Sequence, residues 1–254
     1  MEKKSDILYP EDVAETLKHR DILKKKSFLR KLYIDWYNYL INKSKEVENK
    51  EGKILEIGSG GGFFKEIFSE VITSDILKLD NVDEVFNAEQ LPFSDNSLKS
   101  IVMINVFHHI PRPYLLLEEA QRSLVEGGKI LMIEPANSSF ARFIYTRFHS
   151  EPFDVNGERE IKADSPLFNS NQALPYIYFE RDLPRFQSTY KQLTLKSIHY
   201  HTPFSYLLSG GFSKPSLLPG FMYSTVKFAE GLLRPFNRKI GLFCTIEIEK
   251  IKNI

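Results

Sequence analysis

The sequence predicts an α/β protein in which a mostly parallel sheet carries helices on both faces. Short apolar runs alternate with helical patterns between residues 53 and 134, which is typical of strands joined by crossover helices. A glycine-rich turn follows the first apolar run, and polar side chains follow later runs. Because the carboxyl ends of parallel strands meet at one edge of a sheet, we expect a ligand site at that edge.

The composition narrows the class of protein. The chain has 254 residues, of which 42% are apolar, and this is enough for a sizeable core. Its formal net charge of +1 gives no global field that favours nucleic acid. Cys244 is the only cysteine, which excludes an intrachain disulfide, and its strand-like setting predicts a buried thiol. Neither an apolar signal core nor a bilayer-length run is present, so we expect a cytoplasmic protein.

Residues 1–50 are predicted to form an N-terminal helical segment. The first 26 residues are charged and only weakly periodic, whereas a helix is predicted over 26–45. Its apolar stripe predicts core packing, with closure over a ligand as the alternative. The stripe consists of Leu29, Leu32, Tyr33, Trp36 and Leu40. The basic run 24–31 is interpreted as the solvated face of a helix.

The glycine turn is the centre of the prediction. A strand over 53–57 leads into Gly58, Gly60 and Gly62, where a ligand can lie against bare backbone at a helix N-terminus. This geometry suits a cofactor that carries a carboxylate and an adenosine. A dinucleotide fingerprint is the alternative, but it needs its third glycine where this chain has Phe63.

The next strand supplies a candidate ribose ligand. A helix marked by Phe64, Ile67 and Phe68 precedes a strand over 71–74, and Asp75 follows directly. A carboxylate at this position can accept hydrogen bonds from two vicinal ribose hydroxyls. An ordinary turn aspartate is the alternative interpretation.

Three further strands are predicted in this half of the chain, over 82–86, 100–105 and 129–134. Asn105 ends the second of them and is expected to point a hydrogen-bonding group at the same edge. Pro111 and Pro113 are predicted to open a helix that Gly127 and Gly128 close.

The second half of the chain breaks this rhythm. Residues 135–192 are rich in proline and aromatic residues, with one clear helical stripe over 140–148. Residues 193–254 are predicted to return to the sheet with strands over 193–201 and 242–251. Between these strands, 203–240 forms an insertion with a helix over 224–233. Long connections are uncommon unless they carry function, so we assign 135–192 to a substrate cap and 203–240 to a lid.

Taken together, the motifs in order resemble those of a class I S-adenosylmethionine-dependent methyltransferase. The resemblance is to the broad methyltransferase type 11-like group, which includes quinone-biosynthesis and small-molecule enzymes. It implies a Rossmann-like, seven-stranded sheet whose last strand is antiparallel, with a cofactor-binding core over 51–134. The matching motifs are Ile54–Gly62, Asp75, Ala88–Phe93, Phe107–Ile110 and Glu126–Lys129.

The resemblance also implies the cofactor, S-adenosylmethionine, and the residues that hold it. The methionyl part would contact Glu56, Asn105 and the turn, the ribose would bind Asp75, and adenine would contact Ile76, Asn87 and Ala88. The family often has aspartate where Asn87 stands, but the asparagine carbonyl can still accept from the adenine amino group. The implied cofactor residues are Glu56, Gly58, Ser59, Gly60, Gly62, Asp75, Ile76, Asn87, Ala88 and Asn105.

Methyl transfer is an in-line displacement, so the site must align and desolvate its reactants. Positioning can supply about 7–11 kcal/mol, whereas a general base typically adds about 10²–10⁴-fold, so a base is optional. His149 is the candidate base because it lies in the loop after the fifth strand and histidine titrates near neutrality. A hydrogen bond within that loop is the alternative. His108 and His109 are interpreted as structural or cofactor-adjacent, and no histidine spacing is typical of a metal site, so none is predicted.

The predicted function is methyl transfer to an oxygen of a small-molecule or lipid-like acceptor, since the cap is aromatic rather than basic. A cofactor-binding regulatory protein without turnover is one alternative. A nucleic-acid methyltransferase is another, and it would need the basic run 24–31 at the crevice mouth with aromatic residues that stack a flipped base. The stretch 221–236 is compatible with peripheral membrane contact, although a lid helix is preferred.

Overall fold

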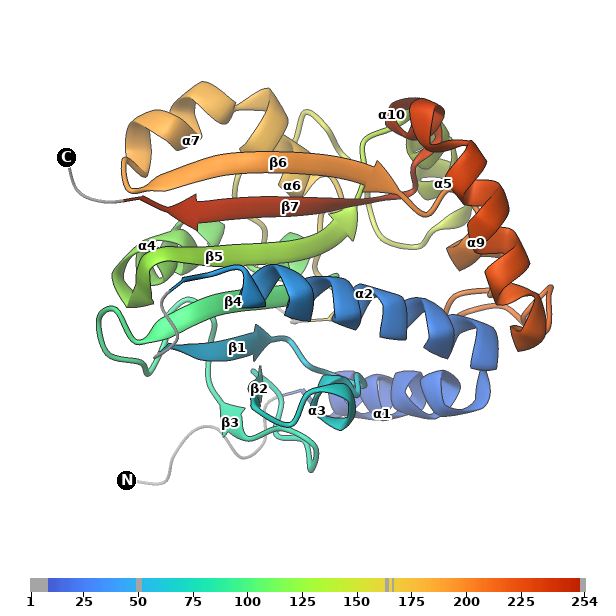
Figure 1. Cartoon of the computed structure of the whole chain (residues 1–254), viewed down its shortest axis with the longest axis horizontal. Coiled ribbons are helices and arrows are strands. Elements are labelled where there is room, and N and C mark those ends of the chain that lie inside the picture. Colours follow the sequence, from blue (N-terminus) through green and yellow to red (C-terminus); the bar gives the residue numbers. More distant parts are fainter. Residues whose placement is uncertain (1–8, 49–51, 163–164, 166, 252–254) are drawn as a thin grey trace.

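The computed structural model describes residues 9–48, 52–162, 165 and 167–251 (Figure 1). Seven strands form one sheet in the order β3-β2-β1-β4-β5-β7-β6. Only β7 runs antiparallel to its neighbours in this sheet, which confirms the predicted fold class. The strands are β1 (Lys53–Ile57), β2 (Val71–Asp75), β3 (Glu84–Val85), β4 (Leu98–Ile104), β5 (Leu124–Pro135), β6 (Leu193–His201) and β7 (Phe243–Lys250).

Helices cover both faces of the sheet, and short helical turns connect several of them. The α-helices are α1 (Pro10–Lys25), α2 (Ser27–Lys45), α3 (Phe64–Ile67), α4 (Pro113–Ser123), α5 (Ser139–Phe148), α6 (Leu174–Tyr176), α7 (Leu183–Thr189), α8 (Ser205–Leu208), α9 (Tyr223–Leu232) and α10 (Asn237–Ile240). The short turns are η1 (Phe107–His109), η2 (Ile177–Arg181), η3 (Gly220–Met222) and η4 (Arg234–Phe236).

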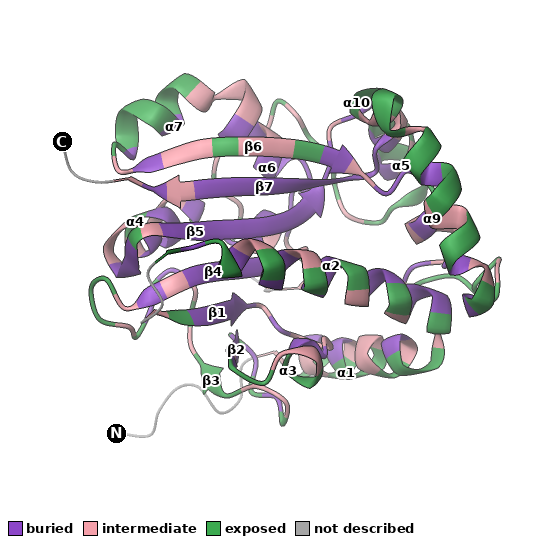
Figure 2. Cartoon of the chain, viewed as in Figure 1, coloured by how far each residue is buried: buried purple, intermediate pink, exposed green. Residues whose placement is uncertain are grey.

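Two apolar cores lie on opposite faces of the sheet. One contains α4, α6, η2 and α7, and the other contains α2 together with α3 and α5. In the second core, Trp36 is 4% exposed and Leu32 is fully buried, so the predicted core role of the α2 stripe is confirmed. Figure 2 shows the buried central strands and the exposed outer surfaces of α7 and α9.

Helix α1 lies within the predicted N-terminal helical segment, but its own bounds were not predicted from the sequence. Its inner face is largely polar and includes the buried side chains of Asp12 and Thr16, so apolar periodicity is weak. Its end signals are nevertheless present, since Pro10 opens the helix and Lys24 and Lys25 lie in its last turn. Helix-end chemistry therefore could have identified α1 where the apolar pattern failed.

The predicted end of the fourth helix at Gly127 and Gly128 is wrong. Helix α4 already ends at Ser123, and both glycines lie inside β5. The pairing of β5 with β4 jumps from Leu124 to Lys129, so the glycines occupy an irregularity in the strand. Gly127 has a φ of +75°, which glycine adopts without strain.

The predicted third strand over 82–86 is reduced to the two residues of β3. Asp83 lies directly before β3, and its Oδ2 accepts hydrogen bonds from the backbone N–H and the hydroxyl of Thr73, at 3.0 and 2.9 Å. The backbone N–H groups of Asp83 and Phe86 also donate to the carbonyls of Thr73 and Asp75, at 3.0 and 3.1 Å, so bonding to β2 continues on both sides of the two-residue strand.

Part of the segment 135–192 packs into a core rather than over the crevice. Fully buried side chains from α6, η2 and α7 lie against the sheet, among them Leu174, Phe179 and Phe186. The sequence did not reveal these helices because Pro175 and Pro184 interrupt their pattern, although each proline stands in a first helical turn. The division of the chain into core, cap and lid stays a prediction.

Candidate active site

A cavity of about 260 Å³ lies at the carboxyl ends of β1, β2 and β4. It occupies the sheet edge that the sequence predicted for a ligand. Seven of the ten predicted cofactor residues line it: Gly58, Gly60, Asp75, Ile76, Asn87, Ala88 and Asn105. We call Gly58, Gly60, Asp75 and Asn105 the strand-end wall, because each lies at or just beyond the end of a strand.

The glycine turn needs glycine for two different reasons. Gly58 and Gly60 have φ of +68° and +48°, the left-handed region that L side chains rarely adopt. A Cβ atom on Gly58 would also collide with Val106, whereas the nearest atom to a Cβ on Gly60 would be Cγ2 of Thr16 at 3.7 Å. Gly58 therefore packs tightly against the turn after β4, and Gly60 leaves space.

Asp75 holds the turn and faces the cavity at the same time. Its Oδ2 accepts a hydrogen bond from the N–H of Gly60 at 2.8 Å, and its Oδ1 accepts one from the N–H of Leu77 at 2.9 Å. Burial raises the pKa of the Asp75 carboxyl, although these backbone donors oppose that shift. A carboxylate has about four acceptor sites, so Asp75 can also accept from a ligand hydroxyl.

The other three predicted cofactor residues contact the protein around the glycine turn rather than the cavity. The hydroxyl of Ser59 donates to Oε2 of Glu56 at 2.5 Å and accepts from the N–H of Ser74 at 3.2 Å. Burial raises the pKa of Glu56 to about 8. A Cβ on Gly62 would approach the Tyr37 hydroxyl at 2.5 Å, so this glycine contacts protein. None of the three is among the described residues that line the cavity.

Asn105 provides a specific test of whether a ligand fits. It has a φ of +56°, and its Oδ1 is buried without a hydrogen-bond partner among the residues that the structure describes. Asn105 therefore gives the wall a buried acceptor without a donor from the described residues, beside the carboxylate of Asp75. These residues fit a ligand with ribose hydroxyls, an ammonium group and a sulfonium charge, as S-adenosylmethionine has.

Comparisons with known proteins agree with this geometry. Residues 26–197 match the model of a methyltransferase domain family. The chain belongs to this family. An uncharacterized protein of Methanocaldococcus jannaschii is 32% identical to it over 172 residues, which are 59% of this chain and 83% of the relative.

One solved structure shows the same fold at low sequence identity. A geranyl diphosphate methyltransferase in complex with S-adenosylmethionine has a TM-score of 0.50 and 13% identity, and the match covers 88% of this chain and 87% of that one. A methyltransferase from Methanosarcina mazei has a TM-score of 0.48 and 15% identity, with 82% and 97% covered. The protein is thus an S-adenosylmethionine-dependent methyltransferase, and S-adenosylmethionine is its cofactor.

A second set of residues lines the methyltransferase cavity from elements outside the sheet. Tyr9 and Thr16, at and within α1, line it together with Ser165 and Leu167 of the connection after β5, and we call these four residues the cover. The hydroxyl of Ser165 donates to Oδ1 of the buried Asp12 at 3.0 Å, which ties the connection to α1. The sequence prediction missed all four.

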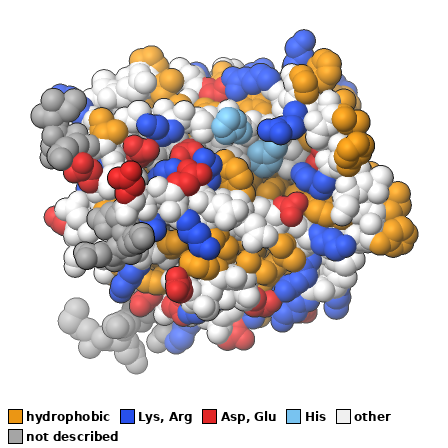
Figure 3. All heavy atoms as spheres, viewed as in Figure 1, with side chains coloured by type: hydrophobic (Ala, Val, Ile, Leu, Met, Phe, Trp, Pro, Cys, Tyr) orange, Lys and Arg blue, Asp and Glu red, His pale blue; other side chains and the backbone are white. Residues whose placement is uncertain are grey.

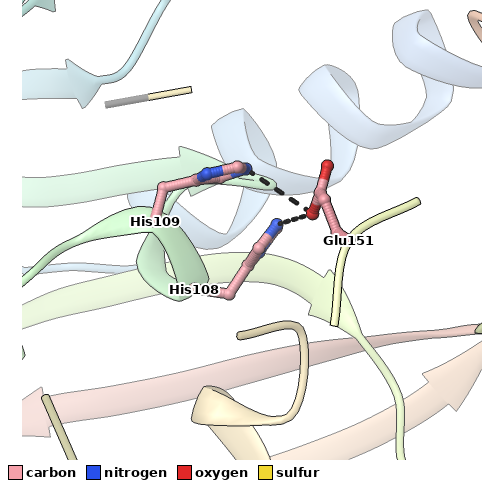
Figure 4. A group of neighbouring side chains, drawn as sticks. All are labelled: His108, His109 and Glu151. Atoms are coloured by element: carbon pink, nitrogen blue, oxygen red, sulfur yellow. Dashed lines mark ion pairs between the residues drawn. The ribbon is translucent and has the colours of Figure 1, made fainter. Parts of the chain in front are cut away.

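A histidine–carboxylate cluster adjoins the cavity (Figure 4). Nδ1 of His108 lies 2.6 Å from Oε2 of the fully buried Glu134, and its Nε2 lies 3.4 Å from Oε2 of Glu151. Burial lowers the pKa of His108, but the charge and hydrogen bond of Glu134 outweigh burial and raise it to about 9. The sequence had suggested that His108 is structural or cofactor-adjacent, and the structure makes it the centre of this cluster.

His109 reaches the cavity wall, unlike His108. Its Nε2 lies 3.9 Å from Oε2 of Glu151, and its Nδ1 is buried without a hydrogen-bond partner in the described part of the chain. Burial and the neighbouring His108 lower its pKa to about 3. The pKa of Glu151 is lowered, because hydrogen bonding and charge from His108 outweigh the effect of burial.

His149, the predicted catalytic base, lies beside this cluster. It is not among the described residues that line the cavity. Its Nδ1 lies 2.6 Å from Nε2 of Gln172 and accepts from the N–H of Glu151 at 3.2 Å, so it makes the loop hydrogen bonds of the alternative interpretation. Burial lowers its pKa. The catalytic role of His149 stays a prediction.

Proposed function

We propose that this methyltransferase methylates a hydroxyl oxygen of a lipid-like acceptor at an anionic membrane surface. The observation that supports this proposal is a cluster of exposed large apolar side chains on α5, α9 and the neighbouring loops. Figure 3 shows hydrophobic side chains gathered over α9, at the right of the view. We call this set the apolar surface: Phe143, Phe148, Phe204, Leu217, Phe221, Phe228, Leu232 and Phe236.

The exposure of these side chains is unusual for a water-facing surface. Phe221 is 80% exposed, and Phe228 and Leu217 are each 71% exposed. Contiguous exposed apolar side chains mark interaction sites more often than isolated ones do. Insertion of aromatic and aliphatic side chains into the headgroup region would remove them from water.

The charge around the apolar surface favours an anionic partner. Residues 139–148 and 211–240 contain seven Lys and Arg residues and a single acid, Glu230. Glu230 is buried, accepts from the N–H groups of Phe204 and Ser205, and pairs with Lys227 at 2.9 Å. The chain as a whole has a net charge of only +1, so positive charge is concentrated here. Each cation near an anionic lipid surface contributes about 1 kcal/mol.

The apolar surface lies at the same edge of the sheet as the cavity, where the parallel strands have their carboxyl ends. Helix α5 begins shortly after β5 ends at Pro135, and the loop that carries Phe204 follows the end of β6 at His201. In Figure 1 these strand ends and α9 lie on the right, toward which β1 and β4 also run. An acceptor held at a membrane would therefore approach the edge at which the cofactor binds.

When bound, S-adenosylmethionine supplies a methyl carbon whose bond to sulfur breaks, with the electron pair left on sulfur, as the acceptor oxygen bonds to carbon. The hydroxyl proton leaves to a neighbouring base or to water. The strand-end wall contributes orientation: Asp75 would hold the ribose, and Asn105 would accept from the methionyl end. The cover would exclude water from the reactants, which strengthens the electrostatic interactions that align them.

The experiment combines labelling and membrane binding. Purified protein is incubated with isotopically methyl-labelled cofactor and separated lipid and aqueous cell extracts, and mass spectrometry locates the label. We expect label in the lipid extract as a methyl ether. Label confined to the aqueous extract, or carried on nitrogen or carbon, would contradict the proposed acceptor.

Vesicle binding tests the apolar surface separately. We expect co-sedimentation with phosphatidylglycerol vesicles, weaker binding to phosphatidylcholine vesicles, and at least a tenfold loss for the double variant Phe221→Ser, Phe228→Ser. Replacement of exposed Lys18 and Lys78 by Ser, away from this surface, is the control and should leave vesicle binding within twofold. Equal binding by the wild type and the aromatic double variant would refute the membrane contact.

No observation favours the two alternative functions. Within the basic run, Lys26 donates to the carbonyl of Gly211 at 2.6 Å, Lys31 donates to that of Gly220 at 2.9 Å, and Arg30 pairs with Glu66 at 2.7 Å. These cations hold neighbouring loops and helices, which disfavours a nucleic-acid groove. The described helices also include none with the length and apolarity to cross a bilayer. A cytoplasmic location stays a prediction.

A further inference from the structure

We propose that His108, His109 and Glu151 form a binding site for a divalent first-row transition-metal ion. No local spacing in the sequence indicates this site, because Glu151 stands far along the chain from the two histidines. In the structure the three side chains converge from η1 and from the connection after β5 (Figure 4). Among the described residues, these three side chains lie close enough together to bind one metal ion.

The separations between the ligand atoms suit a shared ion. One ligand atom from each residue lies within 4.8 Å of the others. The distances to Oε2 of Glu151 are 3.4 Å from Nε2 of His108 and 3.9 Å from Nε2 of His109. Bonds of about 2.0–2.1 Å in a tetrahedral zinc site place ligand atoms about 3.3 Å apart. For these two pairs, shifts of less than an ångström would reach that spacing.

Glu134 prepares His108 for this role. Its Oε2 lies 2.6 Å from Nδ1 of His108, and its Oε1 accepts from the N–H groups of Val106 and Phe107, each at 2.8 Å. The carboxylate is therefore fixed by the backbone, and the imidazole is fixed by the carboxylate. Metal-binding histidines commonly donate their second ring N–H to such a carboxylate, which leaves the other nitrogen for the ion. Here that nitrogen is Nε2, which faces Glu151.

Ion pairs between the two histidines and Glu151 leave some buried polar atoms of the cluster without a hydrogen-bond partner among the described residues. Nδ1 of His109 and Oε1 of Gln172 are both buried without a hydrogen-bond partner in the described part of the structure. Gln172 also contacts the cluster, since its Nε2 lies 3.4 Å from Oε2 of Glu151. Buried polar groups without partners are costly, and a water ligand of a bound ion could donate to Oε1 of Gln172, whereas Nδ1 of His109 lies on the far side of its ring from Nε2.

The ligand types restrict the ion. Two imidazoles and one carboxylate suit Zn²⁺, Mn²⁺, Fe²⁺, Co²⁺ or Ni²⁺, whereas Mg²⁺ and Ca²⁺ prefer sets of oxygen ligands. Three protein ligands leave at least one coordination position open. His109 also lines the cofactor cavity, so the ion would lie beside the reaction region. If that open position takes the acceptor oxygen, this role rests on the proposed function, but the metal site itself does not.

Direct binding measurements test the site. Full-length protein is stripped with a chelator, dialysed, and titrated with ZnCl₂, MnCl₂ or MgCl₂, and bound metal is counted by mass spectrometry. We expect one equivalent of Zn²⁺ or Mn²⁺ per chain and no comparable binding of Mg²⁺. Co²⁺ should give visible absorption bands whose intensity reports its coordination geometry.

Variants separate the cluster from other metal-binding groups. We expect His109→Gln and Glu151→Gln to weaken binding at least 100-fold and Glu134→Gln to weaken it about 10–100-fold. His199→Gln, an exposed histidine on β6, is the matched control and should leave binding unchanged. Circular dichroism and the thermal midpoint show whether each variant is folded, and Co²⁺ absorption is compared only between folded variants.

The outcomes are distinguishable from those of the proposed function. Absence of stoichiometric binding of these transition metals, or equal binding by wild type and both ligand variants, would overturn the metal site. Lipid methylation by metal-free protein would leave the proposed function standing and would remove the ion from it. Stoichiometric metal binding without a methylated lipid product would support the metal site and contradict the proposed function.

Discussion

The strand-end wall and the cover line the same cavity, but different features of the fold place them there. The wall follows from sheet topology, because Gly58, Asp75 and Asn105 each stand where a parallel strand ends. The cover depends on a contact between Asp12 and Ser165, which are 153 residues apart. Asp75 of the wall accepts two backbone hydrogen bonds, one of them fully buried, whereas the cover is joined by the part-buried bond of Ser165 to Asp12. We therefore expect substitutions in the wall to have the larger effects.

The largest expected effect comes from the glycine turn. Gly58→Ala should destabilise the fold by about 2–4 kcal/mol, because it adds both a strained φ and an overpacked contact with Val106. Gly127→Ala is a matched control, since its φ of +75° is similar to +68° but no atom lies within 4 Å of an added Cβ. It should cost about 1–2 kcal/mol. Urea unfolding of both variants measures the difference, and equal losses would show that packing against Val106 is unimportant.

Cofactor affinity at the wall is the next largest effect. Asp75→Ala should weaken S-adenosylmethionine binding by about 1.5–3 kcal/mol, the range for hydrogen bonds to a charged group. Isothermal titration calorimetry measures this affinity. Asp95→Ala removes a mostly exposed carboxylate that pairs with Arg122, so it should leave the affinity unchanged. If Asp75→Ala binds the cofactor as the wild type does, Asp75 is not the ribose ligand.

The buried Glu56 predicts a pH dependence of stability. Its pKa of about 8 in the folded protein exceeds the value of 4.5 expected when it is exposed, so folding takes up a proton between these values. Stability from this group is therefore present below pH 4.5 and is lost as the pH rises toward 8. Glu56→Gln should flatten this decline and gain stability relative to wild type at pH 8.5. Urea midpoints at about pH 5.5 and 8.5 measure it, and parallel pH profiles would count against a neutral buried Glu56.

The cover should give the smallest effect. Ser165→Ala removes the hydrogen bond to Asp12 and should weaken cofactor binding by about 0.5–1.5 kcal/mol, mainly through faster dissociation. Ser94→Ala, in an exposed loop, is the control for loss of a surface hydroxyl. Stopped-flow displacement of the cofactor measures the rate. A larger loss here than for Asp75→Ala would reverse the proposed ranking of cover and wall.

The sequence allowed the sheet and most of the wall to be predicted, because both depend on local patterns. Apolar runs indicated the strands, and strand ends indicated Asp75 and Asn105. The bounds of helix α1 were not predicted because its buried face is largely polar. The proline-interrupted helices after α5 were not predicted because their burial depends on the sheet against which they pack. The metal-site candidate depends on Glu151 meeting His108 across 43 positions in the chain, which no local spacing encodes.

The position of β7 has a consequence for biosynthesis. This strand pairs with β5 on one side and β6 on the other, so it joins β6 to the remainder of the sheet. As the nascent chain leaves the ribosome, β6 emerges about 50 residues before β7 and has no partner strand to receive it. The edge of β5 stays open for the same interval. Until residue 250 has emerged, this growing polypeptide exposes two unpaired strand edges that chaperones or neighbouring chains can bind.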